Sequence, residues 1–156
     1  MAREIKAALT YAQNQELEQT HSQAAERDVD QVMSFIENFI VTYTDYFEEG
    51  KINLFAVEAH PNIRQKEAQV AFILINLTGE TISEMTAKIQ LEVEDFGVTF
   101  DAMDWTIPAE FLGDWEDGYA ILVVDNVPMN GAPTKMSYGI GDIVMDVGEI
   151  MVRHPK

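Results

Sequence analysis

The most continuously apolar run in the sequence is residues 69–77 (QVAFILINL), in which six apolar residues follow Gln69 without a polar break. A membrane-spanning helix needs about 20 apolar residues, so this run is too short to cross a bilayer. Its β-branched and aromatic residues, bounded by polar segments, are typical of a strand buried on both faces. The rest of the chain must therefore provide two covers for one central strand. We predict that its main apolar side chains are all buried: Val70, Phe72, Ile73, Leu74 and Ile75.

One predicted cover is an amphipathic helix over residues 28–47, whose apolar side chains recur at steps of three and four and share one face. After Gly50 the period changes to two, most clearly over residues 87–94, as in strands with one wet face. Short strands separated by turn residues, without helical crossovers, predict a mainly β fold. We expect an antiparallel immunoglobulin-like β-sandwich with the N-terminal helix packed on it. The alternative is an α+β fold with one antiparallel sheet.

The expected domain organisation is one globular domain of residues 28–156, comprising the helix and a β-sandwich over residues 51–153. Residues 1–27 are polar and are expected to form a helical arm that is free to move. A turn is expected at residues 59–62 because they contain Pro61, and another at residues 128–133. The first residues contain no apolar signal region, so we expect a cytoplasmic protein without a membrane span.

The charge is strongly acidic, with 27 Asp and Glu against 10 Lys and Arg and a formal net charge of −17. Such a charge repels nucleic acid and anionic membranes and favours basic partners. Residues 89–134 contain no Lys or Arg. A solubilising surface is the simpler interpretation of these acids, and a docking face for a basic protein is the other. Six of them are candidate partner-binding residues: Asp101, Asp104, Glu110, Asp114, Glu116 and Asp117.

The sequence offers no motif for catalysis, cofactor binding or metal binding. Cysteine is absent, which excludes disulfides, thiolate zinc sites and thiol nucleophiles. His21, His60 and His154 lack the spacing of metal ligands. Residues 114–118 (DWEDG) resemble a calcium loop, but Gly118 stands fifth where an EF-hand needs glycine sixth. We therefore predict no catalytic residue, cofactor or metal, with a looser calcium site in the loops left as an alternative.

Four segments occur in a suggestive order: INLFAVEAHP (52–61), VAFILINLTGETI (70–82) with Asn76, KIQLEVED (88–95) and DWTIP (104–108) before a further strand. From Ile52 to Val127 this pattern resembles the SLAP-type immunoglobulin-like domains of S-layer and accessory secretion proteins of Gram-positive bacteria. The match is one of pattern rather than of a diagnostic motif. It implies an assembly or interaction role in the cell envelope or its secretion machinery, without catalytic residues. The helical N-terminus and the missing signal peptide depart from that family.

The leading functional hypothesis is a non-enzymatic interaction, assembly or adaptor protein. Three aromatic residues of the predicted helix exceed what packing on one sheet needs, and predict a homodimer or larger assembly: Phe35, Phe39 and Tyr46. An alternative is an acidic inhibitor that mimics nucleic acid, which requires carboxylates at phosphate-like intervals on one face. A less favoured hypothesis is an enzyme that uses Asp101, Asp104 and Glu110, which would then have to line a cleft.

Overall fold

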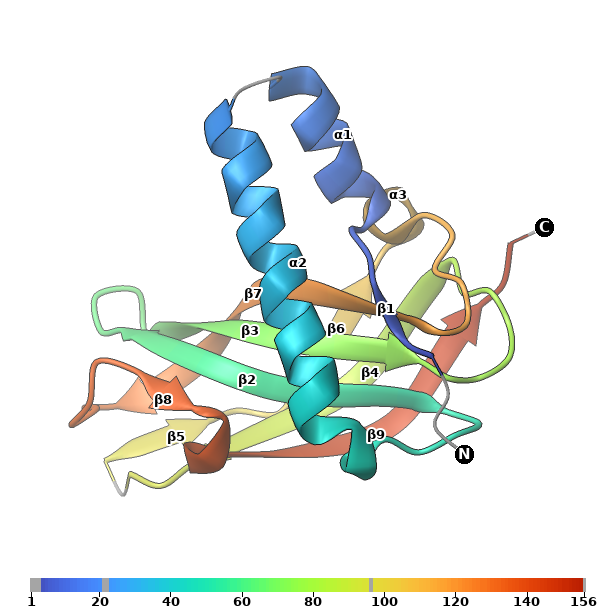
Figure 1. Ribbon diagram of the computed structural model, residues 1–156. Helices are drawn as coiled ribbons and strands as arrows, with labels where there is room; N and C mark the ends of the chain where they lie inside the picture. The colour runs from blue at the N-terminus through green and yellow to red at the C-terminus, as the bar shows by residue number, and fades with distance from the viewer. Residues whose placement is uncertain (1–3, 21–22, 96, 156) are drawn as a thin grey trace.

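The computed structural model describes residues 4–20, 23–95 and 97–155. Two sheets face each other, and a long helix crosses the outer face of the larger one (Figure 1). The elements in chain order are β1 (Lys6–Ala7), α1 (Tyr11–Thr20), α2 (Gln23–Tyr43), η1 (Thr44–Tyr46), β2 (Ile52–Asn62), β3 (Glu67–Asn76), β4 (Glu84–Val93), β5 (Val98–Phe100), β6 (Met103–Ile107), α3 (Ala109–Leu112), β7 (Tyr119–Gly131), β8 (Tyr138–Gly139), η2 (Ile140–Asp142) and β9 (Ile143–Arg153).

The larger sheet has the order β1-β7-β3-β2-β8, with β5 also paired to β7, and the smaller sheet has the order β6-β4-β9. Strand pairs are antiparallel except for the short parallel pair of β1 with β7. The prediction of a mainly β fold with a sandwich of two sheets and a helix packed on it is confirmed. Its immunoglobulin-like character stays a prediction.

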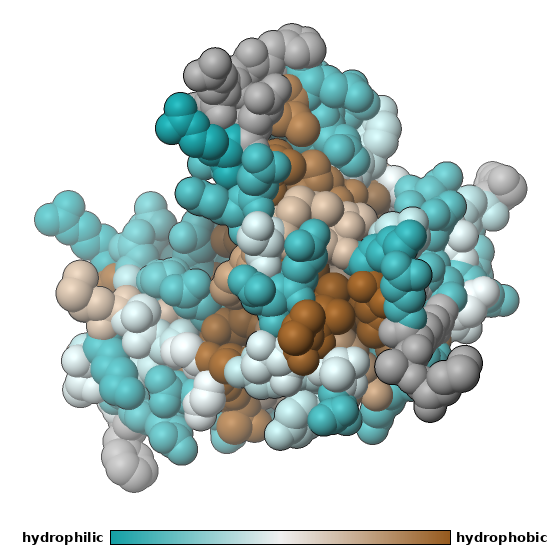
Figure 2. Space-filling model, viewed as in Figure 1, coloured by the Kyte–Doolittle hydropathy of each residue, from teal (hydrophilic) through white to brown (hydrophobic). Residues whose placement is uncertain are grey.

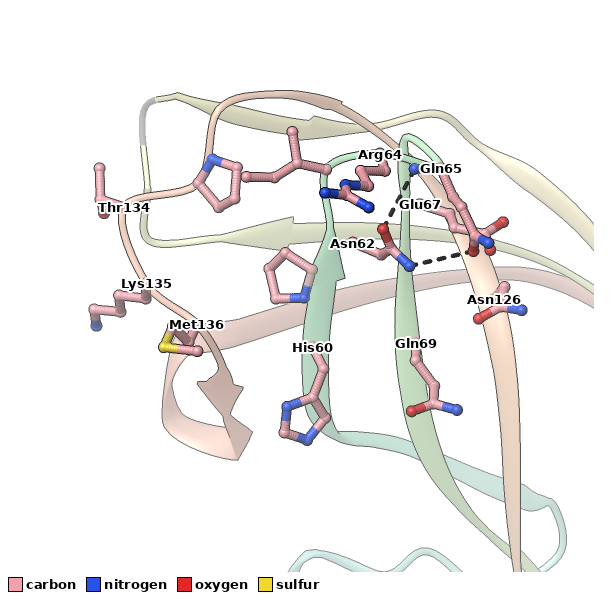
Figure 3. A pocket seen from close by; sticks show the side chains of 13 residues that line it. His60, Asn62, Arg64, Gln65, Glu67, Gln69, Asn126, Thr134, Lys135 and Met136 are labelled. Carbon is pink, nitrogen blue, oxygen red and sulfur yellow. Dashed lines mark hydrogen bonds between the residues drawn. The ribbon is translucent and has the colours of Figure 1, made fainter.

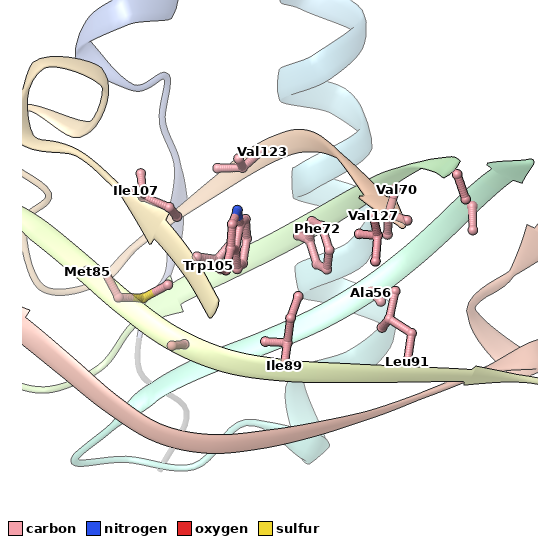
Figure 4. Close-up of a cluster of buried hydrophobic side chains, with 14 of the residues drawn as sticks. Ala56, Val70, Phe72, Met85, Ile89, Leu91, Trp105, Ile107, Val123 and Val127 are labelled. Carbon is pink, nitrogen blue, oxygen red and sulfur yellow. The ribbon is translucent and has the colours of Figure 1, made fainter. Parts of the chain in front are cut away.

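Strand β3 is buried on both faces, as the sequence predicts. Val70, Phe72 and Leu74 face the smaller sheet, and Ile73 and Ile75 face α2. All five side chains are 0% exposed. Figure 4 shows the inter-sheet cluster, where the Phe72 and Trp105 rings lie 4.4 Å apart between their centroids, with α2 on the other side of β3. Both predicted covers are therefore present.

Helix α2 begins earlier and ends earlier than predicted, at Gln23 and Tyr43 rather than 28 and 47. Ile36 and Phe39 are its buried apolar side chains. The Phe39 ring lies 5.1 Å from that of Phe55 on β2 and 4.7 Å from that of Tyr43. The interpretation of Phe39 as part of a free oligomer face is therefore wrong, because this ring packs within its own chain.

The N-terminal segment lies against the domain rather than apart from it, which corrects the expected mobile arm. The amides of Lys6 and Ala8 donate to carbonyls of Gly118 and Ala120 at 3.0 and 2.9 Å. Thr10 and Gln13 cap α1 reciprocally, and Gln13 Nε2 also donates to the Leu122 carbonyl at 2.8 Å. β1 covers the edge of β7 at Tyr119 and Ala120, and Gln13 of the capping box covers it further along, at Leu122.

Two expected turns are also wrong. Strand β2 runs through Pro61 to Asn62, and β7 runs through Pro128 to Gly131. Proline is tolerated in a strand where no second neighbour needs its missing N–H. Beside β2, β8 pairs only with Glu58 and Ala59, so Pro61 has a strand partner on one side alone.

Replacing Phe72 with Ala removes a ring that is fully buried against Trp105. We expect it to lower the free energy of unfolding by about 3–5 kcal/mol, as truncations of core aromatic residues do. Urea denaturation followed by tryptophan fluorescence measures the change. The matched control is Val41→Ala, because Val41 is exposed on α2; equal losses in the two variants would contradict burial of β3 on both faces.

Replacing Gln13 with Ala removes both halves of its attachment, to Thr10 and to the Leu122 carbonyl. We expect a loss of about 1 kcal/mol. We also expect faster hydrogen exchange of the Ala8 and Asn14 amides, which bond to carbonyls in this region. Gln19→Ala, in the exposed last turn of α1, is the control. Unchanged exchange at Ala8 would show that β1 holds the segment without the capping box.

Candidate functional site

A β-bulge at Val57 decides which side chains β2 presents to α2. The pairing of β2 with β3 shifts between Ala56 and Glu58, so that Val57 is an extra residue. Ala56 and Ala59 both face the inter-sheet core. In a regular strand, side chains alternate, and Glu58 would follow Ala56 into that core. The bulge instead turns Glu58 onto the α2 side, where a charged group stays in contact with water.

Two cross-strand rows of this sheet face form the floor of a cleft beside α2. His60 pairs with Gln69 and Gln69 with Asn126, while in the next row Glu58 pairs with Ala71 and Ala71 with Val124. The wall is one flank of α2, formed by residues at helical spacing. The open cavity between them measures about 400 Å³, and we call it the α2 cleft; it is lined by Asp28, Gln31, Val32, Phe35, Glu58, His60, Gln69, Ala71, Leu122 and Val124.

The α2 cleft exposes apolar side chains that the rest of the domain leaves uncovered. Phe35 is 42% exposed on the wall and Val124 is 50% exposed on the floor. Figure 2 shows apolar surface set back on the left side of α2, between polar residues. Of the predicted oligomer face, Phe35 therefore lies in this cleft, and Tyr46 is 71% exposed at the other end of the helix. A homodimer through these two residues stays a prediction.

A second cavity of about 830 Å³ continues from the α2 cleft, because His60 and Gln69 line both. It lies between the turn that joins β2 to β3 and the segment of residues 133–136 (Figure 3). Asn62 and Gln65 bond to each other in the turn, at 3.3 Å in each direction. Arg64 and Lys135 are its basic residues, and Lys135 pairs with Asp142 at 3.8 Å. We call this space the hairpin cavity.

Asp95 fixes the segment that borders the hairpin cavity. Its Oδ2 accepts hydrogen bonds from the Tyr138 hydroxyl at 2.6 Å and from the Thr134 amide and hydroxyl at 2.8 Å each. The bond from Tyr138, followed by those from Thr134 and the Gly97 amide, holds the pKa of Asp95 far below its ordinary value. Burial and the Asp95 carboxylate raise the pKa of Tyr138 to about 12.

The polar groups of the α2 cleft include a close pair of His and Glu side chains. His60 Nε2 lies 2.9 Å from a Glu58 carboxylate oxygen, so the two side chains form a pair. Among the described lining residues there is no Ser, Thr or Tyr hydroxyl and no Lys amine for that pair to activate. In the described part of the chain, no three His, Asp or Glu side chains are grouped to hold a metal ion.

The six acids predicted to bind a partner are not brought onto one face. Asp101 accepts a hydrogen bond from Asn130 near the end of β7, at 3.2 Å, and Asp117 precedes the start of β7 and accepts from the Gly79 amide at 2.9 Å. Because β7 has 13 residues, its two ends lie roughly 40 Å apart along the strand at about 3.3 Å per residue. Asp104 lies on β6 opposite Lys88 of β4. Glu110 belongs to α3, and Asp114 and Glu116 follow it.

The three carboxylates of the enzyme hypothesis are placed apart from the two cavities described above. Asp101, Asp104 and Glu110 lie on different segments, and none of them lines the α2 cleft or the hairpin cavity. Of the histidines, His154 Nδ1 lies 2.8 Å from the Thr81 carbonyl oxygen, and His21 lies outside the described residues. Sequence reasoning named Phe35 but missed Glu58, Gln69 and Val124. The only sequence signal for them is the polar interruption after Val57, which does not reveal a bulge.

Comparison of the chain with protein-family models, with curated proteins and with solved structures finds no match in any of the three. The resemblance to SLAP-type domains therefore stays a prediction. Within the described residues, no helix has both the length and the apolar character required to cross a membrane. The interpretation of the α2 cleft consequently rests on its own geometry and charge.

Replacing Tyr138 with Phe removes the main donor to Asp95 while keeping the buried ring. Because the pKa of Asp95 is lowered by folding, its stabilising effect is complete above the unfolded value of about 4 and is lost as the pH falls below it. We expect Tyr138→Phe to lower the melting temperature at neutral pH and to flatten its decline in acid. Tyr46→Phe is the exposed control. Parallel pH profiles for Tyr138→Phe and wild type would contradict this.

Proposed function

We propose that this chain is a non-enzymatic interaction protein, acting in assembly or as an adaptor, which binds a polypeptide segment of another protein in the α2 cleft. The observation that carries the proposal is the pair of half-exposed apolar side chains, Phe35 and Val124, which lie on the wall and the floor of one cavity. Exposed apolar surface that is rimmed by polar groups is characteristic of interaction sites. Glu58, His60 and Gln69 provide those polar groups.

Further features support binding over the other hypotheses. The floor belongs to three paired strands and the wall to a helix anchored by Ile36 and Phe39, so the cleft is formed before any ligand arrives. Asp101 and Asp117 lie near opposite ends of β7, which gives less support to a nucleic-acid mimic with closely spaced carboxylates. The absence of cysteine supports a cytoplasmic location, and a link to secretion or envelope assembly rests on the sequence resemblance alone.

Selection of peptides from a random display library on the immobilised protein tests the proposal. Recovered peptides should bind wild type and lose about tenfold or more in affinity on Val124→Glu, because a charge then stands where an apolar contact forms. Val144→Glu is the matched control, since Val144 is 59% exposed on β9 and belongs to the other sheet. Recovery only of peptides that bind both variants equally would overturn the proposal. Melting curves confirm that both variants are folded.

A further inference from the structure

We propose that the segment bound in the α2 cleft is an amphipathic helix with Lys or Arg on its polar side. This inference rests on the function proposed above and adds the conformation and charge of the ligand. Its three supports are the hydrogen bonding of the floor, the spacing of the wall residues and the charge of the protein.

Over β2 and β3, the floor of the cleft offers side chains and no free backbone; among the described residues, the outer edge of β7 has strand partners only at its two ends. At the rows of His60 and Glu58, β2 pairs with β3, and β3 pairs with β7 at Gln69 and Ala71. A strand lying in the cleft would find no ladder to join there, and its buried N–H and C=O groups would lose their bonds to water. A helix satisfies its own backbone groups. The helix-in-groove mode of recognition therefore fits the face of the sheet in the cleft, whereas strand addition fits only the outer edge of β7.

The wall presents the matching surface of a helix. Asp28, Val32 and Phe35 are spaced by four and three residues, which places them along one flank of α2. Such rows of side chains form the ridges and grooves into which a second helix packs. The other flank of α2 contacts β1. One helix thus covers part of this sheet face, and a ligand helix beside Phe35 and over Val124 would extend the same layer.

The charge of the protein selects a basic ligand. With a net charge of −17, the domain attracts cations over a distance of about 8 Å at physiological salt, the Debye length. The carboxylates of Asp28 and Glu58 stand at the border of the apolar surface in the cleft. Basic side chains on the polar side of a helix could pair with both. A second copy of this chain carries the same −17 and is repelled, so a basic segment of another protein is the better occupant.

Three synthetic peptides of about 18 residues test the inference, since this length gives a helix of five turns. The first places Leu at helical spacing with Lys elsewhere, the second alternates the same residues at a period of two, and the third replaces Lys with Glu in the first pattern. Fluorescence anisotropy measures the binding of each peptide to wild type, Val124→Glu and Val144→Glu. Val124→Glu adds negative charge, so a purely electrostatic attraction of Lys would increase, whereas binding in the cleft decreases.

We expect the first peptide to bind wild type about tenfold or more tightly than the other two, and to lose that advantage on Val124→Glu but not on Val144→Glu. The double variant Asp28→Asn with Glu58→Gln should weaken binding of the first peptide more than the control double variant Glu92→Gln with Asp146→Asn. The control removes the same charge from the other sheet, where Glu92 lies opposite Val144 and Asp146 lies opposite Gln90. Preference for the alternating or acidic peptide, with dependence on Val124, would overturn the inference and keep the proposed function. If all three synthetic peptides bind equally to wild type and Val124→Glu, while library peptides still require Val124, the inference is likewise overturned and the proposed function is kept.

Two further outcomes separate the remaining occupants. Library peptides and synthetic peptides that are all insensitive to Val124→Glu would overturn the proposed function together with this inference. Light scattering is run on wild type and on Val124→Glu without peptide. A dimer mass for wild type that falls to a monomer mass in the variant would assign the cleft to a second copy of the chain, and would overturn the choice of a basic partner helix.

Discussion

The burial of β3 on both faces is the constraint on which the remaining structure depends. Alternate side chains of one strand require different covers, a second sheet for Phe72 and a helix for Ile73 and Ile75. On the helix side, the residues from Glu67 through Gln69 and Ala71 to Ile75 change from polar to apolar along the strand. Apolar burial therefore holds α2 over the Ile75 half. The cleft lies over the other half of β3, at Gln69 and Ala71, where apolar burial holds α2 less firmly against the sheet.

The bulge at Val57 gives the same cleft its polar chemistry. One extra residue in β2 keeps Ala59 in the core and moves Glu58 and His60 to the α2 side. Burying a carboxylate without a partner in the inter-sheet core would cost several kcal/mol. The bulge avoids that cost, and it also places Glu58 in register with Ala71 and, through it, Val124. A single local irregularity thus serves stability and sets the border between apolar floor and polar rim.

The sequence predicted what depends on local periodicity and missed what depends on pairing between distant strands. The apolar run at β3 predicts that two covers are needed, and the three-and-four spacing of α2 identifies one of them. Both signals exist because burial on a given face produces a periodic pattern of apolar residues. The cleft produces no such pattern in the sequence, because Gln69 and Asn126 are brought side by side only by the register between β3 and β7. Phe39 was placed on the wrong surface because its partner, Phe55, comes from β2. The N-terminal segment was misjudged because its anchor is the Leu122 carbonyl, a backbone group without a sequence signature.

In the proposed function, the charge of the protein and the α2 cleft contribute to recognition in different ways. Acids such as Asp101 and Asp117, near opposite ends of β7, create a negative electrostatic field but do not form a single binding site. Such a field accelerates encounter with any basic protein and is screened by salt, so it acts mainly on the association rate. Retention depends on desolvated apolar contacts, which act mainly on the dissociation rate. Phe35 and Val124 offer those contacts in one cavity. If the proposed function holds, selectivity among basic partners comes from the cleft, because the field alone attracts all of them.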